Sequence, residues 1–229
     1  IRQNCRFDKR VEYFPSWSDA EFNFSAIEAA KEVPLSSDGM FSIMFAGNIG
    51  EAQDFPAVLD AAECLKDDMR IRWLIVGDGR ASDWVKSEVK RRGLEHCFLM
   101  LGRYPVDRMP SFYKHADALL VSLKDEPIFA MTIPGKLQTY LAAGIPVLAM
   151  LNGEGAEIVE RSGAGFSCSA GDGQALAVAA RQMAKLDFAN RKAMGECGLA
   201  VSKKEFDRVS LISNLLSCFD NLLLAKPSE

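Results

Sequence analysis

The sequence predicts an α/β domain in which helices cover both faces of a parallel β-sheet. Short, uniformly apolar runs such as Phe41–Ala46 and Ile71–Val76 lack the polar alternation of a strand with one face in water. Segments with helical spacing of apolar residues separate these runs. Such alternation indicates parallel strands joined by right-handed crossovers.

These patterns place the individual elements along the chain. Strands are expected at residues 41–46, 71–76, 97–101, 118–122 and 145–150. Helices are expected at about 54–65, around 84–89, at 105–115, after Pro134 and through Glu160. The second of these helices should carry Trp84, Val85 and Val89 on one face.

The last expected helix, Val209–Leu223, is strongly amphipathic. Its apolar stripe consists of Val209, Ile212, Leu215, Leu216, Phe219, Leu222 and Leu223. A stripe of this kind predicts that the helix packs against another surface.

Composition excludes several classes of protein. The 229 residues suffice for one large α/β domain, or one domain plus a tail. A net charge of −4 argues against a nucleic-acid-binding protein. The six cysteines form no C-x-x-C pair, which predicts reduced thiols rather than a zinc or redox site. No apolar run approaches the roughly 20 residues of a spanning helix, and no signal peptide is visible. The chain opens without methionine, so we expect a fragment.

The stretch from Phe129 to Met150 contains the strongest candidate for a functional residue. Pro134 and Gly135 form a turn, and Lys136 then falls in the first turn of the following helix. The helix dipole disfavours a cation there, so an anion that rests on the helix start would explain the lysine better. From the spacing alone, a solvated lysine on an ordinary αβ unit is the preferred interpretation, and the wider sequence context shifts the balance.

Two glycine loops add a weaker indication of phosphate binding. Gly47–Gly50 and Gly77–Gly79 each follow a strand and precede a helix. Glycines let backbone N–H groups approach phosphate oxygens, which makes Gly50 a candidate ligand. Many α/β domains contain such loops without a ligand.

The segment IPGKLQTYLAAGIPVLAM resembles the signature of family 4 retaining glycosyltransferases. Other stretches resemble the same family in the same order: RVEYFPSWSDAEF, LIVGDG with FLMLGRYP, MPSFYKHADALLVSL, and GAGFSCSAGDGQALAVAARQM. The resemblance implies one half of a two-domain GT-B enzyme, with a Rossmann-like donor-binding domain at residues 36–203. Residues 1–35 would be an interdomain linker and 204–229 a C-terminal amphipathic helix.

The resemblance also implies roles for single residues. Gly102, Arg103 and Tyr104 would flank the nucleotide base, and Asp78 or Arg80 could line its edge. The residues implied at the diphosphate are Thr132, Gly135 and Lys136, with Lys136 as the catalytic group that neutralises the leaving diphosphate. Glu154 would approach the sugar or the ribose. For Asp78, Arg80 and Glu154, a solvated loop residue is an equally good interpretation.

Two departures from the family pattern concern the diphosphate and the ribose. Where many members carry an Arg and a Lys after the first strand, this chain has Asn48 and Gln53. Where many members carry a pair of glutamates, it has Met131 and Thr139. This variant resembles the bacterial lipopolysaccharide and amino-sugar transferase branch, in which Lys136 would carry more of the phosphate binding.

The implied activity is hexosyl or N-acetylhexosaminyl transfer from a UDP-sugar in cell-envelope polysaccharide synthesis. No D-x-D pair occurs, so we expect no bound metal, and no cofactor beyond the nucleotide sugar as substrate. A missing N-terminal domain would bind a lipid-linked or saccharide acceptor, and the chain alone should be inactive. The resemblance implies a cytoplasmic protein and leaves open peripheral contact of the full-length protein with the inner face of the membrane.

Three other functions stay open at this point. Gly77-Asp78-Gly79 after a strand suggests an NAD-dependent oxidoreductase domain, although Ser82 stands where the third glycine belongs. Loss of the Arg and Lys would fit a non-catalytic nucleotide-sugar-binding module. A sugar epimerase of the same architecture is the third, because a fold does not fix a function.

Overall fold

The computed structural model describes residues 12–17, 24–35 and 39–224. Within these residues the sheet has six parallel strands in the order β3-β2-β1-β4-β5-β6. The strands are β1 Phe41–Ala46, β2 Ile71–Val76, β3 Phe98–Gly102, β4 Ala118–Ser122, β5 Val147–Met150 and β6 Gly165–Cys168. The predicted α/β fold is confirmed, and the strand order reverses between β1 and β4, the point at which such sheets bind ligands.

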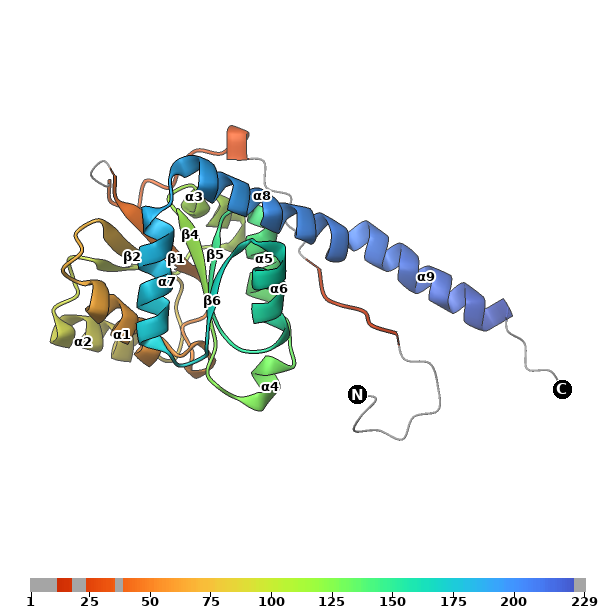
Figure 1. The fold of residues 1–229 in the computed structure, drawn as a ribbon, viewed down its shortest axis with the longest axis horizontal. Coiled ribbons are helices and arrows are strands. Elements are labelled where there is room, and N and C mark those ends of the chain that lie inside the picture. The colour runs from red at the N-terminus through yellow and green to blue at the C-terminus, as the bar shows by residue number, and fades with distance from the viewer. Residues whose placement is uncertain (1–11, 18–23, 36–38, 225–229) are drawn as a thin grey trace.

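Helices cover both faces of this sheet (Figure 1). The α-helices are α1 Phe55–Leu65, α2 Ser82–Arg92, α3 Met109–Tyr113, α4 Pro127–Ala130, α5 Gly135–Ala143, α6 Glu154–Ser162, α7 Gly173–Lys185, α8 Phe188–Glu205 and α9 Arg208–Leu224. Short 3-10 helices are η1 Phe24–Ala26, η2 Glu51–Gln53 and η3 Val106–Arg108. Helices α1, α2 and α7 lie on one face, and α3, α5 and α6 lie on the other.

Two apolar clusters hold these layers together. Phe45, Phe55 and Trp73 belong to the cluster between the sheet, α1 and α7. Met44 and Tyr140 belong to the cluster beneath α3, α5 and α6. Successive residues of β1 thus enter opposite clusters, because side chains alternate across a strand.

Two of the predicted helices differ from their expected form. Residues 105–115 form η3 followed by the short α3, because Pro110 near the start of α3 removes a backbone donor. Trp84 does not share the buried face of α2, so that prediction was wrong: Val85 and Val89 are buried, whereas Trp84 is 44% exposed. Residue 84 lies about 100° around the helix from residue 85 and therefore faces outward.

The segment before β1 packs along α3. The ammonium of Lys114 donates to the carbonyl of Ile27 at 2.7 Å, and His115 Nε2 lies 2.9 Å from the carbonyl oxygen of Ala30. Arg108 forms an ion pair with Glu32 at 3.0 Å. These contacts fix the path of the chain into β1 and give His115 a structural role.

Helix α9 extends away from the sheet (Figure 1). Five apolar residues of its predicted stripe are more than half exposed: Val209, Leu216, Phe219, Leu222 and Leu223. In the described ranges, no helix combines the length and apolarity needed to span a bilayer.

Candidate functional site

A cleft of about 550 Å³ opens at the carboxyl ends of β1, β2 and β3. Loops after these strands form one side, and α3 and α5 form the other. Its lining includes Gly47, Asn48, Asp78, Gly79, Arg103, Tyr104, Val106, Met109, Tyr113, Lys136, Thr139 and Tyr140. The cleft therefore lies at the reversal of strand order, where a parallel sheet binds ligands.

The backbone amides of the two glycine loops are engaged within the chain. Gly47 donates to the carbonyl of Val76 at 2.8 Å, and Ile49 donates to that of Asp78 at 2.9 Å. The amide of Gly50 donates to Gln53 Oε1 at 3.1 Å, and that of Gly79 to Asp78 Oδ1 at 2.8 Å. These N–H groups are directed at protein oxygens, so the cradle expected at Gly47–Gly50 is not open in this structure.

Lys136 is a partly buried cation at the start of α5. Its Nζ lies 3.8 Å from the centre of the Phe45 ring. The side chain crosses Gly47, where an added Cβ would lie 2.4 Å from Lys136 Cε. In the described part of the chain no carboxylate pairs with the ammonium. Burial lowers the pKa of Lys136 to about 7.

The far end of the cleft combines charge with a pair of tilted aromatic rings. Tyr104 packs on Phe112 with ring centres 4.5 Å apart, and the Arg108 guanidinium lies 5.7 Å from both rings. The nearby Ser82 hydroxyl and the Gly79 amide hold the pKa of Asp78 below its usual value. The Gly79 amide forms a full hydrogen bond with Asp78, whereas the Ser82 hydroxyl lies near it without one. This end offers a rigid aromatic wall with a carboxylate at its edge.

The cleft brings together four of the residues expected in a nucleotide site: Asp78, Arg103, Tyr104 and Lys136. Gly102 directly precedes Arg103 in the chain, and its carbonyl accepts a hydrogen bond from the Gly77 amide at 2.7 Å. The other residues lie outside the lining. Thr132 is exposed and donates to the Phe129 carbonyl at 3.0 Å, Gly135 begins α5, and Glu154 is the exposed first residue of α6.

Among the lining residues that the sequence did not select as ligands are Thr139, Tyr140 and Tyr113. Thr139 and Tyr140 follow Lys136 by three and four positions on α5, so helical spacing alone could have placed them beside it. Tyr113 comes from α3, and no local pattern connects it with Lys136.

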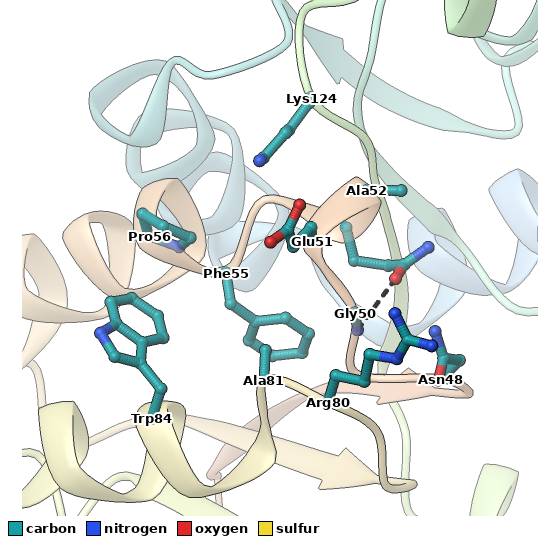
Figure 2. A pocket seen from close by; sticks show the side chains of 11 residues that line it. Asn48, Gly50, Glu51, Ala52, Phe55, Pro56, Arg80, Ala81, Trp84 and Lys124 are labelled. Atoms are coloured by element: carbon teal, nitrogen blue, oxygen red, sulfur yellow. Dashed lines mark hydrogen bonds between the residues drawn. The ribbon is translucent and has the colours of Figure 1, made fainter.

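Arg80 and Gly50 lie in a second cavity, of about 710 Å³, on the α1–α2 side of the loop that follows β1 (Figure 2). The lining is Asn48, Gly50, Glu51, Ala52, Gln53, Phe55, Pro56, Arg80, Ala81, Trp84 and Lys124. Asn48 is shared with the first cleft. Of the two residues given as alternatives for the edge of the base, Asp78 lines the cleft and Arg80 lies in this second cavity.

The described residues hold no group of three or more His, Cys, Asp or Glu side chains arranged to bind a metal ion. Cys64, Cys97, Cys168, Cys197 and Cys218 are free thiols.

Comparison with known proteins identifies the family. The sequence model of the family described as Glycosyl transferases group 1 matches residues 41–185, well over half of the chain. The chain belongs to this family.

Two curated relatives have sequences similar to this glycosyl transferase group 1 domain. One is WbjE of Pseudomonas aeruginosa, named as a glycosyltransferase, 28% identical over 185 residues that cover 78% of this chain and 44% of WbjE. The other is WcaI of Escherichia coli K12, whose name assigns it to colanic acid biosynthesis, 33% identical over 141 residues that cover 59% of this chain and 34% of WcaI. The chain thus spans less than half the length of these relatives.

Solved structures share the GT-B fold of this domain. The crystal structure of HepE from Anabaena in complex with UDP-glucose superimposes with a TM-score of 0.67 at 20% identity, covering 80% of this chain and 49% of HepE. The predicted Rossmann-like half of a GT-B enzyme is thereby confirmed as a fold.

Proposed function

We propose that this domain is the donor-binding half of a retaining, metal-independent glycosyltransferase that uses a UDP-sugar in cell-envelope polysaccharide synthesis. The observation that carries the proposal is Lys136: a desolvated cation with no carboxylate partner among the described residues, set at a helix start beside a cleft. Such a group is suited to an anion that supplies the missing negative charge. The HepE complex with UDP-glucose and the name of WcaI support the choice of donor and pathway.

The cleft suggests how the donor lies. The base would stack at Tyr104, with the ribose near Thr139 and the diphosphate at Lys136 and the start of α5. As the bond from the sugar to the diphosphate breaks, negative charge grows on the leaving group. A cation already in place stabilises that charge without reorganisation. Transfer of a hexosyl or N-acetylhexosaminyl group fits this arrangement, and the nucleotide sugar is a substrate rather than a cofactor.

We further propose that an acceptor-binding domain completes the enzyme. The exposed apolar stripe of α9 is a surface on which that domain would pack, and the linker of residues 1–35 would lead to it. Lipid-linked or saccharide acceptors would bind there, with peripheral contact at the inner membrane face. The domain alone should transfer no sugar, and UDP release above the level of Lys136→Ala would contradict this.

Calorimetric titration with UDP, GDP, UDP-N-acetylglucosamine and NAD tests the donor proposal. We expect one uridine nucleotide to bind, with a loss of roughly ten-fold or more for Lys136→Ala, since it removes a charge-assisted contact. Lys90→Ala, an exposed lysine of α2, is the matched control. Equal nucleotide affinities of Lys136→Ala and Lys90→Ala would contradict the role of Lys136.

A non-catalytic nucleotide-sugar-binding module is the second candidate. It is favoured by Asn48 and Gln53, which leave this loop without a cation, and by the engagement of Gln53 with the Gly50 amide. Nucleotide binding by the domain, combined with no transfer by the full-length protein, would favour this candidate over the enzyme.

A further inference from the structure

The second cavity has walls suited to a ligand, and the proposed donor site does not use it. Its volume of about 710 Å³ falls within the roughly 300–1,000 Å³ of small-molecule pockets. Phe55 and Pro56 of α1, Ala81 just before α2 and Trp84 of α2 form its apolar side (Figure 2). The loop that follows β1 separates it from the nucleotide cleft.

Trp84 is the feature of this cavity that most needs an explanation. Its neighbour Val85 is fully buried, yet the indole is 44% exposed on a helix whose other outward residues are mostly charged. Figure 2 shows the indole beside Pro56 at one end of the cavity. An indole with one free face binds planar or ring-shaped ligands, and the C–H face of a pyranose is such a surface.

The polar groups lie on the other sides of the cavity. Arg80 and Lys124 contribute cations, and neither pairs with a carboxylate in the residues that the structure describes. Glu51 contributes one carboxylate, so the lining keeps a net positive charge. Unpaired cations in the same cavity as an exposed aromatic ring favour a ligand that carries both an anionic group and a ring.

We propose that this cavity is a binding subsite for an acidic saccharide, with the sugar ring on Trp84 and its carboxylate or phosphate drawn to the cations Arg80 and Lys124. Glu51 accepts hydrogen bonds from sugar hydroxyls. Asn48 lines both this cavity and the nucleotide cleft, so a saccharide held here lies next to the proposed donor. The subsite does not depend on nucleotide binding, and the two can fail independently.

The indole N–H resonance of Trp84, assigned by its loss in Trp84→Phe, gives a direct readout. The chain is titrated with methyl β-D-glucuronide, glucose 6-phosphate and neutral methyl β-D-glucoside. We expect saturable shifts with one or both acidic ligands, at affinities roughly ten-fold or more above that of the neutral glycoside. The tighter of the two acidic ligands identifies the anionic group as carboxylate or phosphate.

Charge-removing variants locate the contact. Arg80→Gln and Lys124→Gln should each weaken the acidic ligand several-fold and leave the neutral glycoside unchanged, whereas Lys90→Gln should change neither. Lys136→Ala should also bind the acidic ligand normally, which separates this subsite from the nucleotide cleft. The proposal is overturned if the neutral glycoside binds as tightly as the acidic ones, if no ligand shifts the Trp84 resonance, or if Arg80→Gln and Lys124→Gln match Lys90→Gln. Backbone amide spectra verify that each variant is folded.

Discussion

The hydroxyl of Tyr140 forms hydrogen bonds with both backbone groups of Ala46 at the end of β1. It accepts the Ala46 N–H at 3.0 Å and donates to the Ala46 carbonyl, also at 3.0 Å. The register of β1 with β4 stops at Met44 and Leu119, so the backbone of Ala46 has no strand partner on that side. A side chain of α5 thus replaces a strand at the point where the sheet opens into the cleft beside Lys136.

Tyr140→Phe should lower the free energy of unfolding by about 1–3 kcal/mol, because it leaves buried backbone groups without a partner. For a domain of this size each kcal/mol corresponds to a fall in Tm of roughly 2–4 °C. Thermal unfolding measures this, with Tyr104→Phe as a control in the same cleft. A fall no larger than that of the control would show that water or a backbone shift satisfies Ala46.

Tyr140 should also shape stability at high pH. Burial raises its pKa well above the usual value of tyrosine. A group whose pKa is higher in the folded than in the unfolded state stabilises the fold below the unfolded value of about 10 and ceases to do so as pH rises above it. The wild type should therefore lose stability above pH 10 more steeply than Tyr140→Phe, as urea unfolding at pH 9 and 11 would measure.

Lys136→Met should make the ligand-free domain more stable near pH 7, by about 1–3 kcal/mol, because it removes a poorly solvated cation. The folded-state pKa of about 7 lies below the unfolded value of about 10.4. The destabilisation by Lys136 is therefore complete below pH 7 and diminishes as pH rises towards 10.4. Urea unfolding at pH 6, 8 and 10 should show a shrinking gain, whereas Lys90→Met should show none.

Nucleotide binding at pH 8 should take up close to one proton per site. Lys136, with a pKa of about 7, is mostly neutral at that pH, and a diphosphate beside it raises the pKa. Calorimetry in Tris and in HEPES should give binding enthalpies that differ in proportion to this uptake. The difference should disappear in Lys136→Ala. Equal enthalpies in the two buffers at pH 8 would mean that the bound lysine stays neutral.

Asp54 is the one described non-glycine residue with a positive φ, at 48° between η2 and α1. Asp54→Gly should stabilise the domain by about 1 kcal/mol, since a left-handed backbone is costly for a residue with a Cβ. Asp54→Ala removes the same carboxylate but keeps the Cβ, so the difference between the two variants isolates the backbone contribution.

The carboxylate of Asp54 adds a pH dependence. Desolvation raises its pKa above the usual value. Folding thus disfavours the ionised form of Asp54. The stability that the protonated form contributes is lost as pH rises through the folded-state pKa. Both variants should therefore gain more stability at pH 7 than near pH 4 relative to the wild type. Gains equal at the two pH values would show that the side chain is well solvated.

The sequence predicted the sheet better than the site. The bounds of β1, β2 and β4 match the prediction, because strands buried on both faces are continuously apolar and their ends are marked by polar or glycine residues. The sequence places Tyr140 only within the helix expected after Pro134. Its bond to Ala46 joins residues 94 positions apart, and no local signal reports such a contact.

The failures at the site have the same physical origin. A glycine loop after a strand predicts available amides, yet whether they are available depends on the neighbouring loop. Here Gly77 approaches so closely that an added Cβ would overlap the Gly47 carbonyl. Arg80 and Asp78 are two residues apart in sequence, and the turn between them directs one to each cavity. Side-chain direction in loops follows from tertiary packing, which a single sequence does not contain.

The engagement of the glycine-loop amides with protein oxygens affects how this domain can change over time. A phosphate site made of main-chain N–H groups tolerates most substitutions, since every residue but proline supplies the same donor. A site whose anion affinity depends on one lysine can be altered by a single codon. The sheet would keep its structure after such a change. If the proposed donor site is right, homologues with the same fold could therefore change their donor within few substitutions. Selection experiments at positions 48, 53 and 136 should find new donor preferences in few steps.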